Sequence, residues 1–82
     1  MSGVITVRYF AAAAEAAGVA SETLSAGSVG ALVAAMVQSH GPGLEKVLAR
    51  CLLLVAGVRA ADDATVLAQG VTVDVLPPFA GG

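Results

Sequence analysis

The chain has 82 residues and a formal net charge of −2, with 57% hydrophobic and 12% charged residues. This length supports one small domain, and the charged share is about half of that in an average protein. The four basic residues are scattered, so nucleic acid is not an expected partner. The longest apolar stretches, residues 29–37 and 51–58, are shorter than the roughly 18–20 residues of a membrane span. We therefore expect no membrane partner. Residues 1–10 show no basic region followed by an apolar run, so the expected location is cytoplasmic.

The first third of the chain predicts a strand, a short helix and a second strand. Residues 4–10 are rich in β-branched and aromatic side chains, which is typical of a strand. Alternation gives this strand one apolar face and one wetter face that carries Arg8 and Phe10. Alanine propensity predicts a helix over residues 11–17 that ends at Gly18, and residues 20–26 predict the second strand.

The strongest helix signal follows Ser28, which is a suitable N-cap. Apolar residues recur with helical spacing over residues 29–37, and the helix is expected to end near Gly41 and Pro42. Residues 44–50 allow one or two further helical turns. His40 at the end of the main helix is interpreted as solvent-exposed, because no second ligand or nucleophile accompanies it.

The remaining residues predict two strands that a loop separates. Residues 51–57 are continuously apolar and predict a strand buried on both faces or nearly so, whereas residues 59–70 are expected to form a loop. Residues 71–76 predict the last strand, which Pro77 ends because it lacks a backbone donor. The order of elements predicts an α+β fold in which a main helix covers one face of a mixed sheet. We expect a domain over residues 1–76 and an extended C-terminal tail over residues 77–82.

The usual catalytic constellations are missing from the sequence. Asp62 and Asp63 are adjacent carboxylates of the kind that form turns, so we expect no metal site and no bound cofactor. Cys51 is the single cysteine and is interpreted as a small buried hydrophobic residue. The chemistry of this chain is then expected outside its side chains.

The C-terminal tail is the most distinctive stretch, and it consists of Pro77, Pro78, Phe79, Ala80, Gly81 and Gly82. The prolines favour an extended, stiff exit from the sheet, and glycine backbone can approach another surface closely. Such an end could enter a narrow channel and deliver its carboxylate. The alternative is a frayed terminus in which the two glycines are fortuitous.

The strand faces favour delivery over fraying. If the first and last strands pair in parallel, Arg8 can approach Asp74, and Phe10 can approach Leu76 where the tail begins. Exposed apolar patches of this kind usually mark partner sites. We therefore predict a partner interface at Phe10 and Leu76.

The sequence resembles the MoaD/ThiS family of sulfur carriers, which have the ubiquitin-like β-grasp fold, and within it the small subunit of molybdopterin synthase. The matching segments are "VRYFAAAAEAAG", "SVGALVAAM" and "VTVDVLPPFAGG". The resemblance implies that an E1-like adenylyltransferase uses ATP to activate the Gly82 carboxylate, and that a sulfur donor protein converts it to a thiocarboxylate. The tail would then insert into the large synthase subunit and donate sulfur to the cyclic pterin precursor of the molybdenum cofactor. The chain itself would be a non-catalytic, sulfur-donating subunit of a transferase complex.

Three alternatives stay open at this point. A carrier for thiamine or cysteine synthesis would use the same end, although the helix over residues 11–17 argues against it. A ubiquitin-like modifier would join the adenylated end to lysines, and an interaction domain would have an inert tail. One departure from the family pattern is Ala56 before Gly57, where relatives often have the Asn-Gly turn.

Overall fold

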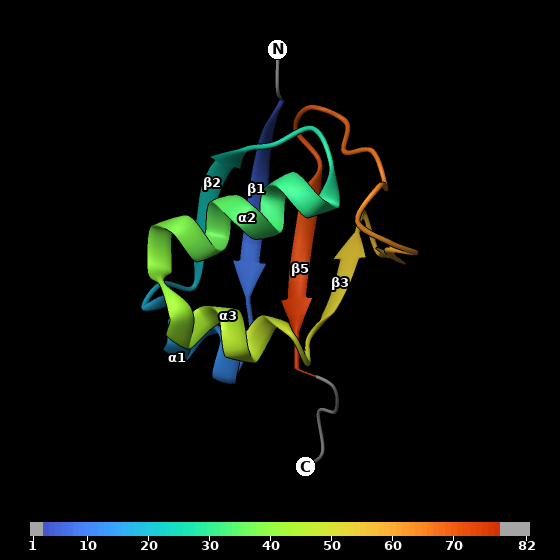
Figure 1. The fold of residues 1–82 in the computed structure, drawn as a ribbon. Coiled ribbons are helices and arrows are strands. Elements are labelled where there is room, and N and C mark those ends of the chain that lie inside the picture. Colours follow the sequence, from blue (N-terminus) through green and yellow to red (C-terminus); the bar gives the residue numbers. More distant parts are fainter. Residues whose placement is uncertain (1–2, 78–82) are drawn as a thin grey trace.

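The computed structural model describes residues 3–77 (Figure 1). Within them the elements follow in the order β1 (Val4–Tyr9), α1 (Ala12–Ala17), β2 (Ser21–Ser25), α2 (Val29–His40), α3 (Pro42–Leu48), β3 (Leu52–Val55), β4 (Val58–Arg59) and β5 (Thr72–Leu76).

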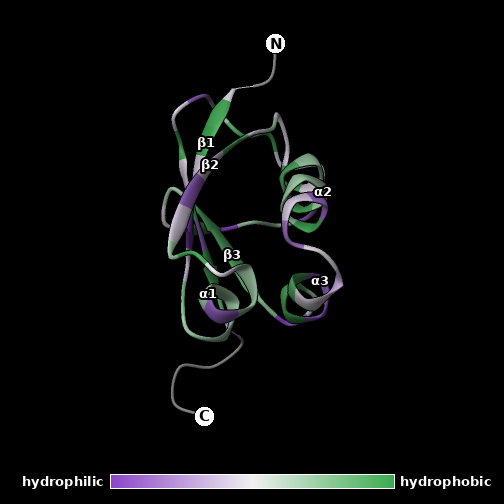
Figure 2. Ribbon diagram, turned by 90° about the vertical axis from the view of Figure 1, so that its left-hand side faces the viewer, coloured by the Kyte–Doolittle hydropathy of each residue, from purple (hydrophilic) through white to green (hydrophobic). Residues whose placement is uncertain are grey.

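The strands form one mixed sheet with the order β2-β1-β5-β3-β4. β1 and β5 are parallel, and the other neighbouring strands are antiparallel. Figure 2 shows the sheet with α2 and α3 on one side of it, while the other side carries no helix. This arrangement confirms the predicted mixed sheet with one face covered by the main helix and one face open.

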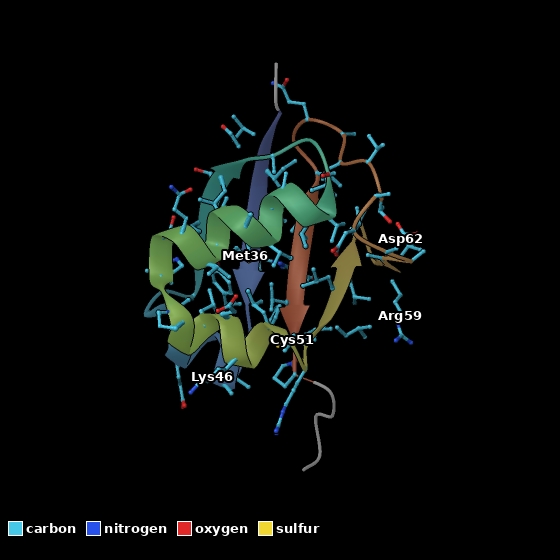
Figure 3. The ribbon with its side chains drawn as sticks, viewed as in Figure 1. Met36, Lys46, Cys51, Arg59 and Asp62 are labelled. Atoms are coloured by element: carbon cyan, nitrogen blue, oxygen red, sulfur yellow. The ribbon has the colours of Figure 1, made fainter. Side chains whose placement is uncertain are left out.

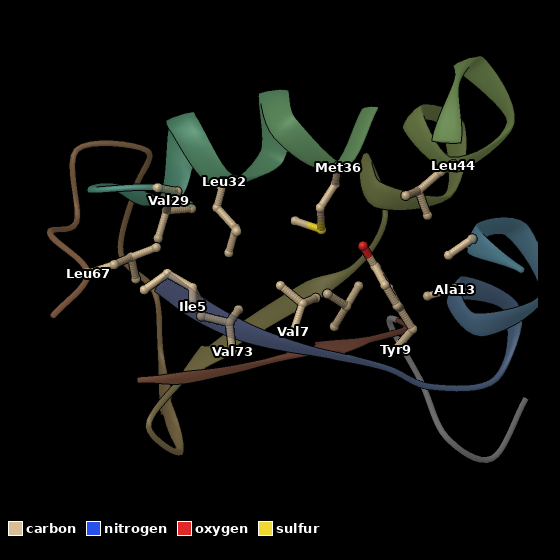
Figure 4. Close-up of a cluster of buried hydrophobic side chains, with 13 residues drawn as sticks. Ile5, Val7, Tyr9, Ala13, Val29, Leu32, Met36, Leu44, Leu67 and Val73 are labelled. Carbon is tan, nitrogen blue, oxygen red and sulfur yellow. The ribbon is translucent and has the colours of Figure 1, made fainter. Parts of the chain in front are cut away.

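The core lies between α2 and the covered face of the sheet (Figure 4). Ile5 and Val7 of β1 are completely buried, as are Leu32 and Met36 of α2. Leu44 of α3 extends the same cluster. The alternation expected for the first strand and the apolar stripe expected for the main helix are both confirmed, because each must bury its apolar face against the other.

The helix ends follow local chemistry. The Ser28 hydroxyl accepts a hydrogen bond from the Ala31 amide at 3.2 Å, which confirms Ser28 as the N-cap of α2. Gly18 ends α1 with a φ of 78°, a left-handed value that glycine adopts without a Cβ clash. The next helix begins at Pro42, two residues before the predicted start. Proline suits the first turn of a helix because the N–H it lacks would have no partner there.

The structure contains a hairpin that the sequence pattern did not predict. β3 turns back at Ala56 and Gly57 and pairs with the two-residue strand β4, which lies in the predicted turn and loop region. Both turn residues have positive φ, 51° at Ala56 and 84° at Gly57, as two-residue hairpin turns require. All four residues of β3 are only half-buried, so the prediction that this strand is buried on both faces was wrong.

Among residues 3–77, each helix is too short, or not apolar enough, to cross a lipid bilayer.

Candidate functional site

The predicted tail begins at the centre of the sheet. β5 lies between β1 and β3 and ends at Leu76, and Pro77 follows it in a half-buried position. The predicted tail residues Pro78, Phe79, Ala80, Gly81 and Gly82 lie outside the described residues. Whatever the tail does, its root is held by hydrogen-bonded strands on both sides.

An ion pair joins the two central strands on the open face of the sheet. The Arg8 guanidinium donates two hydrogen bonds to Asp74, Nε to Oδ1 at 2.6 Å and Nη2 to Oδ2 at 2.8 Å. The hydrogen bonds and the charge of the carboxylate raise the pKa of Arg8, which keeps the guanidinium charged. The contact confirms the predicted parallel pairing of the first and last strands, in which Arg8 and Asp74 are register partners.

Phe10 and Leu76 lie next to this ion pair. The Phe10 amide donates to the Val75 carbonyl at 3.1 Å, which continues the parallel register one residue beyond β1. The guanidinium carbon of Arg8 lies 5.7 Å from the centre of the Phe10 ring, in cation–π range. Phe10 keeps 38% of its surface exposed, so α1, which begins two residues later, does not cover it.

Two further apolar residues share this face. Leu52 is the register partner of Leu76, and Leu54 is that of Asp74. Paired residues on neighbouring strands point to the same side of the sheet, so Leu52 and Leu54 lie on the open face. We call Phe10, Leu52, Leu54 and Leu76 the tail-root patch. The continuous apolar run over residues 51–57 could have predicted that Leu52 and Leu54 belong to the open face. A sheet that is covered on one side leaves every second residue of such a strand on the uncovered side.

A groove lies at the same end of the molecule. It has a volume of about 620 Å³, and α1, α3 and the root of the tail supply its lining of Ala12, Lys46, Val47, Ala49, Arg50, Cys51 and Pro77. We call it the tail-root groove. Its floor is mostly apolar, and Lys46 and Arg50 are exposed at it.

Cys51 differs from its predicted environment. It is half-buried and lines the tail-root groove rather than sitting fully inside the core. Burial still raises the pKa of its thiol, which disfavours the reactive thiolate. Figure 3 shows Cys51 near the end of β5, where the described chain stops.

The prediction that His40 is solvent-exposed was wrong. Its Nε2 lies 2.6 Å from Oε2 of Glu22, and its side chain is 15% exposed. The same carboxylate oxygen accepts a hydrogen bond from the Tyr9 hydroxyl at 2.6 Å. Because Glu22 is on β2 and faces the covered side of the sheet, the cluster ties the end of α2 to two strands. The two contacts join residues that are 18 and 13 positions apart in the chain, and no sequence signal linked them.

The side chains in residues 3–77 include no group of three that could hold a metal ion. Asp62 forms a turn instead: its Oδ1 accepts a hydrogen bond from the Ala64 amide at 2.9 Å, as expected for a carboxylate in a loop.

The arrangement around the tail root is suited to binding. It offers an apolar patch on one side of the sheet and a partly basic groove on the other.

The fold is the ubiquitin-like β-grasp, a mixed sheet with its main helix across one face. Across 98% of this chain and 100% of the other, the structure is similar to the crystal structure of SAMP1 from Haloferax volcanii, with a TM-score of 0.83 and 28% identity. It has the same fold as a putative molybdopterin converting factor subunit 1 from Pyrococcus furiosus, with a TM-score of 0.80 at 24% identity over 95% of this chain and 100% of that one.

A third similar structure is a complex of subunits 1 and 2 of molybdopterin-converting factor from Helicobacter pylori. It matches with a TM-score of 0.73 and 24% identity, over 96% of this chain and 99% of that one. No curated protein sequence matches this chain. The sequence model of the ThiS family matches residues 7–82, so the chain belongs to the ThiS family, whose MoaD/ThiS members are ubiquitin-like sulfur carriers.

Proposed function

We propose that this chain is the sulfur-carrying small subunit of a molybdopterin synthase and that Gly82 carries the sulfur. The observation that carries the proposal is the family match through residue 82, which includes the diglycine end as well as the domain. Two of the similar structures, from P. furiosus and H. pylori, are of molybdopterin-converting factor subunits, and they are the ground for proposing the molybdopterin branch.

The chemistry needs no catalytic side chain from this protein. A carboxylate is a poor acyl donor, so an E1-like enzyme would first join the Gly82 carboxylate to AMP and release pyrophosphate from ATP. A persulfide of a donor protein would then attack the carbonyl carbon and displace AMP, which replaces a C–O bond with a C–S bond. A thiol would reduce the S–S bond of the resulting acyl disulfide and so release the thiocarboxylate from the donor. The thiocarboxylate would finally transfer its sulfur to the cyclic pterin precursor in the large subunit.

The tail-root patch supports a large partner on the open face of the sheet. Phe10, Leu52, Leu54 and Leu76 present apolar surface beside the point where the tail leaves, and the Arg8–Asp74 pair holds the two central strands in register. A partner that covers the patch would meet the tail at its base. Exposed apolar surface rimmed by polar groups is the usual sign of such a contact.

The test is the intact mass of the full chain after incubation with the E1-like enzyme, ATP and a sulfur source. Exchange of one oxygen for sulfur at Gly82 is the expected result. The variant without Gly82 should show no exchange but the same far-UV circular dichroism spectrum as the full chain. A truncated chain that still gains sulfur and supports pterin conversion would overturn the proposal.

A second candidate is a protein modifier, and the similarity to SAMP1, a small archaeal modifier protein, favours it. A modifier would use the same adenylated end but pass it to a lysine amine, with formation of an isopeptide bond. Adducts of this chain on lysines of other proteins, in the same mass experiment, would favour that function. Rescue of thiamine or cysteine synthesis, and not of molybdenum cofactor synthesis, would favour a sulfur carrier for thiamine or cysteine synthesis.

A further inference from the structure

The tail-root groove is not explained by the contacts of the sheet with a partner. It lies on the helix side, between α1 and α3, whereas the tail-root patch is on the open face. Its volume of about 620 Å³ falls within the roughly 300–1,000 Å³ of small binding pockets. Since Pro77 is part of its wall, the groove begins where the predicted tail begins.

The charge of the groove is positive. Arg8 is paired with Asp74, but within residues 3–77 neither Lys46 nor Arg50 has a carboxylate within ion-pair distance. The acidic residues of the adjoining helices are Glu15 on α1 and Glu45 on α3, and neither lines the groove. The occupant is therefore expected to combine an apolar side chain with an anion.

We propose that the groove holds the protein's own residues 78–82 between encounters with partners, with Phe79 on the apolar floor and the Gly82 carboxylate beside Lys46 and Arg50. This inference rests on the proposed function in one respect, which is that the carrier ends in a free Gly82 acyl group. It adds a resting site for that group on the carrier itself.

The length and chemistry of the five residues fit the groove. An extended chain covers at most about 3.3–3.6 Å per residue, so residues 78–82 reach roughly 17 Å from Pro77. This length is enough for the tail to lie along the groove, because Pro77 is already part of the groove wall. The segment has one large apolar side chain, Phe79, and its terminal carboxylate complements the two cations. A thiocarboxylate carries the same charge and would occupy the same place.

Docking would give the carrier two states, one with the tail bound in its own groove and one with the tail in the partner's active site. In the first state the open face stays available for a partner while the acyl end is bound on the helix side. Transfer then requires the tail to leave Lys46 and Arg50 for the partner's active site. We expect the groove to be a competing site that weakens with salt, because exposed ion pairs are screened.

The test is a carbon-13 NMR titration of the Gly82 carboxyl in the full chain. Docking predicts a pKa below the ordinary α-carboxyl value of about 3.3–3.7, by roughly half a unit or more, because nearby cations favour the charged form. The amides of Val47 and Ala49 should move with the same midpoint, and amides of the core should not. Dilution should leave these shifts unchanged, because the contact is within one molecule.

Three single charge reversals make a matched set. Lys46→Glu and Arg50→Glu should each return the Gly82 carboxyl to its ordinary pKa and abolish the linked amide shifts. Arg59→Glu changes the net charge equally, but Arg59 does not line the groove and lies well apart from Lys46, at the right of Figure 3. This variant should leave the titration as it is. Phe79→Ala should weaken docking without a change of charge.

Several results would overturn the proposal. Gly82 could titrate at its ordinary value with no response from the groove amides, or all three reversals could act alike. Shifts that grow with protein concentration would show that a second copy provides the tail. Thiocarboxylate formation is measured separately by mass, so a docked tail that never gains sulfur would refute the proposed function alone.

Discussion

Removal of the Tyr9 hydroxyl tests the cluster that joins β1, β2 and the end of α2. Tyr9 is the only tyrosine of the chain, and 3% of its surface is exposed. Its hydroxyl donates to Glu22, whose other short contact is with His40. Tyr9→Phe keeps the ring, so it isolates one hydrogen bond to a carboxylate.

The expected loss follows from that geometry. A hydrogen bond to a charged group contributes about 1.5–3 kcal/mol to stability, and we expect a loss at the lower end, about 1.5–2 kcal/mol. Glu22 keeps its contact with His40, and its side chain is 21% exposed, so water can replace part of the lost interaction. Urea unfolding followed by far-UV circular dichroism measures this difference.

The same residue gives a pH dependence. Burial, and then the hydrogen bond and charge of Glu22, raise the pKa of Tyr9 above its ordinary value of about 10. The stabilisation is therefore complete below pH ~10 and is lost as the pH rises toward the folded-state pKa. The free energy of unfolding should fall above pH ~10 in the native sequence and stay flatter in Tyr9→Phe.

Tyrosinate absorbance reports on Tyr9 alone, because the chain has one tyrosine and no tryptophan. Ionisation in the folded protein with a midpoint near pH 10, together with a loss below about 0.3 kcal/mol in Tyr9→Phe, would refute this reasoning. Glu22→Gln provides the partner variant. It should lower the pKa of Tyr9 toward its ordinary value without removing the phenol.

Three more changes test other parts of the structure. Phe10→Glu should weaken binding to the large subunit by about tenfold or more, because it buries an unpaired charge in the interface. Val66→Glu, at an exposed loop position, is the control. Equal affinities of the two variants for the large subunit, measured by calorimetry, would place the interface elsewhere. Ala56→Asn should stabilise the protein by about 0.5–1 kcal/mol, because asparagine tolerates the positive φ; an unchanged melting temperature would argue against strain at the turn. Leu32→Ala should lower the free energy of unfolding by about 2–5 kcal/mol in urea, and a loss below 1 kcal/mol would contradict its complete burial.

Local sequence patterns predicted much of the fold, because the interactions that begin and end the helices involve residues close together in the chain. Ser28 caps α2 through an amide three residues away, and Gly18 ends α1 through its own backbone freedom. The predicted parallel pairing of the first and last strands of the chain placed Arg8 beside Asp74, since alternation assigned both to one face.

Features that depend on distant partners were not predicted. β4 has two exposed residues and exists because β3 offers it a free edge, so its own composition carries no strand signal. His40 is held by Glu22, a contact that forms only after α2 lies across the sheet. Leu52 and Leu54 looked like core residues because hydrophobicity does not report which face of a strand is covered.

The parallel arrangement of β1 and β5 has a mechanical consequence. The two strands run side by side, and β1 begins at the end of the sheet opposite to the one where β5 ends (Figure 1). A pull on the C-terminal end against the body of the domain loads their hydrogen bonds in shear, so that the bonds must yield together rather than one at a time. β3 holds the other side of β5 in the same way. A carrier built like this can have its end drawn out of a tight active site repeatedly while the domain stays folded.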